Sequence, residues 1–158
     1  MDMKFNDRMD YEVLTTLDIN NALIKYSIFK GTFPADKVPI SRLQETQAFI
    51  INTAKDYMSG EHWTALIINK KYCIFFDSFG YELFNIDILT SLKNTGVILY
   101  KYNNTQIQPF FSGNCGYYCI AFILSYIQRL TYSEFMNIFS YDMLENNNTC
   151  YNFIKMYI

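Results

Sequence analysis

The longest apolar run of the chain predicts a helix in the middle of the core. From Cys119 to Leu130 nearly every residue is apolar, so this helix would be buried on all sides rather than amphipathic. It follows a small polar loop, and we expect it to begin near Cys115. The run is shorter than the ~20 residues of a membrane span and ends in a polar pair, so no membrane segment is expected.

Two short stretches of strand-like composition flank a polar turn and predict a β-hairpin. Residues 63–68 and 72–77 are rich in β-branched and aromatic residues, and residues 69–71 would form the turn between them. A helix is expected at residues 85–93, ending near a glycine, and a third strand at residues 97–102.

The remaining elements follow from weaker patterns. We expect them as a helix at residues 10–26 that Asp18 could divide, a loop at 29–34, a helix at 41–48, a strand at 49–52, a turn at 56–60, a helix at 132–144, a loop at 146–148 and a terminal strand at 151–158. This order predicts a single α+β domain over residues 1–158, with a small mixed β-sheet packed against the central buried helix.

Composition excludes several classes of protein. Hydrophobic residues make up 51% and charged residues 18% of the chain, which argues against disorder. The net charge is −2 without a run of like charges, so nucleic-acid binding is only weakly supported. The N-terminal residues lack the apolar core of a signal peptide, and the spacings of the four cysteines match no zinc pattern. We therefore expect a monomer in a reducing compartment, with no metal and no cofactor.

Cys115 is the candidate nucleophile. On the first turn of a buried helix it would lie beside free N–H groups and about half a positive charge, which favour a thiolate over a thiol. His62 precedes the first hairpin strand and Asp77 ends the returning one, so the hairpin would bring them side by side. The imidazole would then accept the thiol proton while the carboxylate fixes its tautomer. Taken singly, such a histidine is more often structural and such an aspartate more often a turn residue.

Two glutamines compete for the role of oxyanion donor. Gln108 ends an extended piece seven residues before Cys115, and its side-chain N–H could act together with the Cys115 backbone N–H. Gln106 is the rival for the same role. Gly113 and Gly116 would leave room for a substrate backbone beside the sulfur.

Four features follow one another along the chain: His62-Trp63, residues 77–80, Gln108 and Cys115-Gly116. This ordered set resembles the adenovirus endopeptidase (adenain) family, in the cysteine-protease clan that includes the ubiquitin-like-protein-specific proteases. Further stretches at 29–33, 51–54 and 60–63 resemble the adenovirus branch in the same order, so that the resemblance spans about residues 29–127. It implies a papain-related fold and a cysteine endopeptidase that uses Cys115, His62, Asp77 and Gln108. We expect substrate contacts from Gly31, Thr32, Trp63, Gly113 and Asn114.

The resemblance also implies substrates and a place of action. The family matures capsid or core precursors of DNA viruses near small residues, often glycine, in the virion and the infected host cell. A virophage or Polinton-type element would be a suitable source. The alternative is an isopeptidase that removes ubiquitin or a ubiquitin-like modifier such as SUMO from host proteins. A third hypothesis is that the chain is not an enzyme but a catalytically inactive binding module on the same fold.

Activation is the point at which this chain departs from the family. The resemblance implies a basic enzyme that is activated by DNA and by a peptide, and the peptide is joined to the enzyme through a cysteine. Val97 stands at the position aligned with that cysteine, and the present chain is mildly acidic. Neither a peptide nor a DNA activator is therefore indicated. One hypothesis is that residues 151–158 instead add a strand to the sheet edge.

Overall fold

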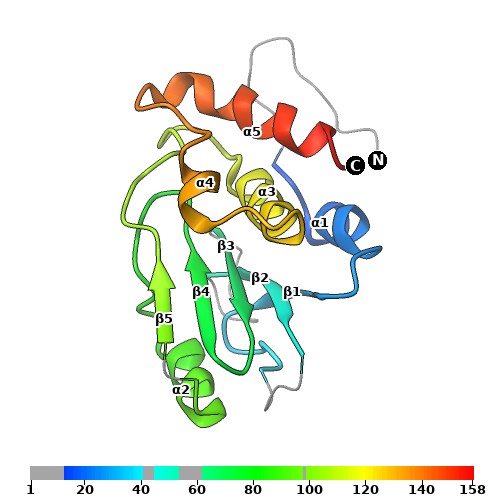
Figure 1. Ribbon diagram of the computed structural model, residues 1–158, viewed down its shortest axis with the longest axis vertical. Coiled ribbons are helices and arrows are strands. Elements are labelled where there is room, and N and C mark those ends of the chain that lie inside the picture. The colour runs from blue at the N-terminus through cyan, green and yellow to red at the C-terminus, as the bar shows by residue number, and fades with distance from the viewer. Residues whose placement is uncertain (1–12, 41–44, 54–61, 98) are drawn as a thin grey trace.

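The computed structural model describes residues 13–40, 45–53, 62–97 and 99–158. Within them a five-stranded mixed sheet has the order β1-β2-β3-β4-β5 (Figure 1). The central pairs β2–β3 and β3–β4 are antiparallel, whereas the outer pairs β1–β2 and β4–β5 are parallel. The strands are β1 (Phe29–Pro34), β2 (Gln47–Asn52), β3 (Trp63–Ile68), β4 (Tyr72–Phe76) and β5 (Leu99–Tyr102).

Helices cover both faces of this sheet. In Figure 1, α3 lies between the sheet and α5, and α2 lies at the far end of the molecule from α5. The α-helices are α1 (Thr16–Leu23), α2 (Ile86–Thr95), α3 (Cys115–Ile127), α4 (Tyr132–Met136) and α5 (Asn146–Lys155), and a 3₁₀ turn, η1 (Met143–Glu145), precedes the last of them. The predicted α+β fold with a mixed sheet against a central helix is therefore confirmed.

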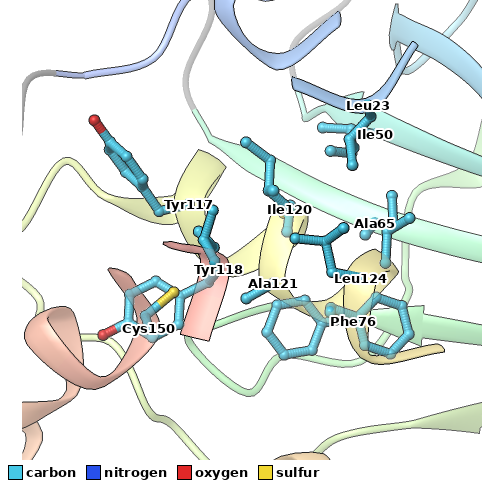
Figure 2. Close-up of a cluster of buried hydrophobic side chains, with 14 of the residues drawn as sticks. Leu23, Ile50, Ala65, Phe76, Tyr117, Tyr118, Ile120, Ala121, Leu124 and Cys150 are labelled. Atoms are coloured by element: carbon cyan, nitrogen blue, oxygen red, sulfur yellow. The ribbon is translucent and has the colours of Figure 1, made fainter. Parts of the chain in front are cut away.

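The core explains why α3 carries no polar face. Every residue of α3 from 115 to 125 is buried. Alternate side chains of the sheet enter two clusters, with Ala65 and Ile67 facing α3 and with Leu66 and Ile68 facing α2. Figure 2 shows the first cluster, in which Ile50, Ala65 and Phe76 of the sheet lie on one side of α3 while Cys150 of α5 lies on the other, near Tyr118. Burial on all sides fixes the helix, and with it the position of Cys115 at its first turn.

Three elements lie close to their predicted positions. The hairpin strands and their turn match, and α2 ends with Gly96 in the left-handed region at φ 75°. The first helix is shorter than expected, because Thr15 caps it and Asp18 completes a capping box with Thr15. Residues 10–12 of the predicted helix and the predicted turn at 56–60 lie outside the described residues.

The N-terminal half of the sheet corrects two predictions. Residues 29–34 form the edge strand β1 rather than a loop, and Gln47 and Ala48 begin β2 rather than end a helix. Residues 41–44 of that expected helix lie outside the described part of the chain. Gly31 and Pro34 suggested a loop, but Gly31 accommodates a bulge at φ 126° and an edge strand tolerates proline at its end.

The C-terminal part corrects three more. The helix expected at 132–144 ends at Met136, and α5 contains the segment expected as a loop together with residues 151–155 of the segment expected as a strand. The buried residues of α5 recur with helical spacing: Cys150, Tyr151, Phe153 and Ile154 all face the core. Because this segment is helical, the hypothesis that residues 151–158 extend the sheet is wrong.

Candidate active site

The hairpin places the histidine and the aspartate at one edge of the sheet. His62 directly precedes β3 and Asp77 directly follows β4, which is antiparallel to it. His62 Nε2 lies 2.9 Å from Asp77 Oδ1, within hydrogen-bonding distance. Asp77 is only 4% exposed, so the carboxylate acts on the imidazole with little screening by solvent.

Asn103, which no sequence pattern indicated, fixes Asp77 from the position that follows the neighbouring strand β5. Its Oδ1 accepts a hydrogen bond from Asp77 N at 3.1 Å, and its Nδ2 donates to Asp77 O at 2.7 Å. The backbone N–H of Phe79 donates to Asp77 Oδ1 at 2.8 Å. Parallel strands end at the same edge, so the residue after β5 could have been placed beside Asp77 once that pairing was known.

The central helix brings Cys115 to the same place. Cys115 is the first residue of α3, and its Sγ accepts a hydrogen bond from the backbone N–H of Trp63 at 3.4 Å. His62 and Cys115 line the same cavity, and the thiol lies near enough to the ring to help raise the pKa of His62. Because Nε2 faces Asp77, the remaining nitrogen, Nδ1, is the one left to serve the sulfur. The structure thus brings His62, Asp77 and Cys115 together at one site.

The surroundings of His62 favour its charged form. Burial opposes the charge, but the hydrogen bond and negative charge of Asp77, with a further contribution from the nearby Cys115, outweigh it and raise the pKa of His62 to about 9. The ring also stacks on Phe79, with centroids 4.8 Å apart and planes 24° apart. Phe79 in turn stacks on Phe110 at 5.6 Å. These contacts hold the imidazole between the carboxylate and the thiol.

Gln108, and not Gln106, reaches the cavity beside Cys115. Gln108 is fully buried; its Oε1 accepts from the Ser78 hydroxyl, and its Nε2 donates to the Ser112 carbonyl at 2.7 Å and to Ser112 Oγ at 3.1 Å. Gln106 Nε2 instead donates to the Gln108 carbonyl at 2.9 Å. The bond to Ser112 Oγ is the longer of the two, so it is the one that Gln108 Nε2 would exchange for a bond to a developing oxyanion.

A cavity of about 460 Å³ lies over these groups. Val13 and Leu14 form part of its wall, and no sequence pattern indicated this position for them. The indole Nε1 of Trp63 donates to the Leu14 carbonyl at 3.2 Å, and a Cβ on Gly113 would come within 2.6 Å of Val13 Cγ2. The cavity is lined by Val13, Leu14, Asn52, His62, Trp63, Phe79, Gln108, Phe110, Ser112, Gly113 and Cys115.

Three of the five expected substrate contacts do not reach this cavity. Gly31 and Thr32 lie on the edge strand β1, and Thr32 Oγ1 donates to Asn20 Oδ1 at 3.1 Å. Asn114 is 1% exposed, and its side-chain amide has no hydrogen-bond partner within the described part of the chain. Trp63 and Gly113 do line the cavity. Gly116 makes room for Leu14 and Trp63 rather than for a substrate, since a Cβ there would lie 3.2 Å from Leu14 Cβ.

The other cysteines are buried core residues. Burial raises the pKa of Cys73 to about 11 and the pKa values of Cys119 and Cys150 well above the usual range, and none of them forms a disulfide. Among the described residues, no group of three or more His, Cys, Asp or Glu side chains could hold a metal ion. No helix in the described ranges has both the length and the apolar character of a membrane span.

Comparison with known proteins places this geometry in a family. The model of the adenovirus endoprotease family matches residues 27–144. The crystal structure of the ASFV pS273R protease superposes with a TM-score of 0.65 at 16% identity, over 92% of this chain and 68% of that one. The selenomethionine form of the same protease gives a TM-score of 0.60 at 17% identity, over 92% and 69%. No curated protein gives a significant match.

At such low sequence identity the likeness to solved structures shows the fold alone. The family is shown by the family model, which matches most of the sequence. The fold and the resemblance expected from the ordered motifs are both confirmed. The chain belongs to the adenovirus endoprotease family and is a cysteine peptidase, a hydrolase.

Proposed function

We propose that this peptidase is a viral maturation endopeptidase that cleaves capsid or core precursor polypeptides, acting at the assembly site in the infected cell and in the virion. In this proposal Cys115 is the nucleophile, His62 the base, Asp77 the orienting acid and Gln108 an oxyanion donor. The observation that carries the assignment of roles is that His62, hydrogen bonded to Asp77, lines one cavity together with Cys115.

The chemistry follows from where each proton can go. His62 accepts the thiol proton, and the sulfur attacks the scissile carbonyl carbon to form a C–S bond. The oxyanion accepts hydrogen bonds from Gln108 Nε2 and from the Cys115 N–H, which lies in the first turn of α3 where no intrahelical acceptor exists. The imidazolium then protonates the leaving amine as the C–N bond breaks. Water activated by neutral His62 hydrolyses the thioester and regenerates the thiol.

The cavity wall supports a preference for small residues beside the scissile bond. Val13 fills the space that a side chain at position 113 would need, and Trp63 lies next to it through its bond to Leu14. A polypeptide passing between these groups and the sulfur has least hindrance where it carries glycine. This agrees with the substrates that the family resemblance implies.

Replacing Gln108 tests the oxyanion role. Gln108→Ala is expected to lower kcat by about 10²- to 10³-fold with little change in KM, because the donor acts mainly in the transition state. Gln106→Ala is the matched control, and its loss should be far smaller. Equal losses in the two variants, measured on a fluorogenic peptide, would assign Gln108 a structural role.

The proposed substrates are tested by incubating the purified protein with candidate virion precursor proteins, with and without DNA. New N-termini are then read by mass spectrometry. Cleavage at discrete sites next to small residues is expected. Failure to cut any precursor, together with labelling of Cys115 by a ubiquitin vinyl-sulfone probe, would instead support an isopeptidase that acts on ubiquitin-like conjugates.

A further inference from the structure

Ser78 carries a buried hydroxyl that the proposed mechanism leaves without a role. The residue directly follows Asp77 and is fully buried. Its hydroxyl donates a hydrogen bond to Gln108 Oε1, and its carbonyl accepts hydrogen bonds from the backbone N–H groups of Ile107 at 2.9 Å and of Gln108 at 3.1 Å. Ser78 therefore holds the proposed oxyanion donor through both its side chain and its backbone.

The partners of the Gln108 amide determine which of its ends is the nitrogen. The Ser112 carbonyl carries no proton and can only accept a hydrogen bond, so the group 2.7 Å from it is Nε2. Oε1 then faces Ser78, whose hydroxyl can only donate to it. Ser112 lines the catalytic cavity and Ser78 does not. The amide is thus held from behind by Ser78, with its N–H groups on the side of the cavity.

The bond from Ser78 is the one that remains when the amide changes partner. In the proposed mechanism Gln108 Nε2 exchanges its bond to Ser112 Oγ for a bond to the oxyanion. The Ser78 hydroxyl still fixes the plane of the amide at that moment. It also draws electron density toward Oε1 and makes the N–H a stronger donor, because linked hydrogen bonds polarise one another. Both effects are largest when negative charge develops in the transition state.

The same short segment also carries the catalytic acid. Asp77 is held by Asn103, which bonds its backbone N–H at 3.1 Å and its carbonyl at 2.7 Å. Two adjacent residues thus face two different parts of the site, since the Asp77 carboxylate meets His62 and the Ser78 hydroxyl meets Gln108. A test of Ser78 therefore has to separate an effect on the oxyanion donor from an effect on the acid.

We propose that Ser78 is a positioning residue that orients and polarises the Gln108 amide toward the oxyanion. Ser78 touches no substrate and acts only through Gln108. The inference rests on the proposed endopeptidase function and deepens it, because it assigns the orientation of the oxyanion donor to a hydroxyl outside the catalytic cavity.

The test is a double-mutant cycle between Ser78 and Gln108, with kcat and KM measured on a fluorogenic peptide. Ser78→Ala should lower kcat about ten-fold with KM unchanged, since the donor remains but loses its anchor. In the Gln108→Ala background the same substitution should lower kcat by less than about two-fold, because the amide through which Ser78 acts is gone. Ser78→Cys keeps the size of the side chain with a much weaker donor, so it should also lower kcat, and it serves if the alanine variant does not fold.

Ser125→Ala is the matched control. Ser125 is another buried serine, and its hydroxyl donates to the Phe122 carbonyl at 2.7 Å, away from the catalytic cavity. Its loss should leave kcat unchanged. Alkylation of Cys115 by iodoacetamide forms no oxyanion, so Ser78→Ala should be labelled at the rate of the unmodified protein. Slower labelling would mean that Ser78 acts through Asp77 and would overturn the proposal.

The outcomes of the cycle separate this inference from the function on which it rests. Unchanged kcat in a folded Ser78 variant, beside a loss of about 10²-fold or more in Gln108→Ala, would overturn the role of Ser78 and leave the endopeptidase standing. An equal loss from Ser78→Ala in both backgrounds would mark a general disturbance of the structure and would overturn it as well. No cleavage by the unmodified protein, despite alkylation of Cys115, would refute the proposed function.

Discussion

Cys115→Ala is expected to abolish peptide cleavage, with a loss of about 10⁶-fold in kcat, while the protein stays folded. In the proposed mechanism the sulfur forms the bond to the substrate carbonyl, and no other thiol lines the catalytic cavity. The structural cost should be small, because the substitution removes one hydrogen bond from the Trp63 N–H, worth about 1 kcal/mol. The measurements are kcat on a fluorogenic peptide and a thermal melt followed by circular dichroism.

Cys119→Ala is the control for this prediction. Cys119 lies one turn further along α3 and is fully buried, so its loss should lower stability but preserve cleavage. Substantial activity in folded Cys115→Ala would remove the sulfur from the mechanism. A folded but inactive Cys119→Ala variant would equally show that the assignment to Cys115 is wrong.

His62→Ala is expected to lower kcat by about 10²- to 10⁴-fold, the usual contribution of a general base. In the proposed mechanism the lost group is also the proton donor to the leaving amine, so a better leaving group should recover part of the rate. Comparison of an amide substrate with the corresponding ester measures this recovery. An equal loss on both substrates would mean that His62 is not the acid in that step.

The same variant has an expected signature in stability. The folded-state pKa of His62 is raised from 6.5 to about 9, so protonated His62 stabilises the folded protein. This contribution is fully present below pH 6.5 and is lost as the pH rises toward 9. The free energy of unfolding of the unmodified protein, relative to His62→Ala, should therefore fall across this range in urea titrations. A difference that stays constant with pH would contradict the raised pKa.

The sequence predicted best the features that local physics determines. A run that is apolar at nearly every position has to be buried, so α3 and the start at Cys115 followed directly. The antiparallel hairpin has one simple register, and it brought His62 beside Asp77. Both inferences needed only neighbouring residues and the period of the element.

What could not be predicted depends on contacts between distant segments. Three successive asparagines disfavour a helix, yet Asn146 donates to the Ile107 carbonyl at 2.9 Å and Asn147 accepts from the Tyr118 hydroxyl. These buried hydrogen bonds offset the poor helix propensity of α5. Val13 likewise reaches the cavity only because α1 packs beside α3, and no local pattern reveals that.

A second cavity, between His62 and α2, shows the same limit. Its floor combines β2, β4 and α2, and its wall depends on the stacking of Phe79, whose aromatic character alone predicted nothing about the site. Gly31 and Thr32, expected as substrate contacts, lie away from the catalytic cavity for a related reason. The position of a residue in a motif does not say whether its strand lies at the edge of the sheet or beside the nucleophile.

The central claim is that His62 activates Cys115, and the rate of iodoacetamide alkylation measures it most directly, because the thiolate is the form that reacts. Peptide mapping at neutral pH should find Cys115 alkylated much faster in the unmodified protein than in His62→Ala, with Cys73, Cys119 and Cys150 unlabelled in both. Equal and slow labelling of Cys115 in the two proteins would contradict the account, since the imidazole would then have no influence on the sulfur.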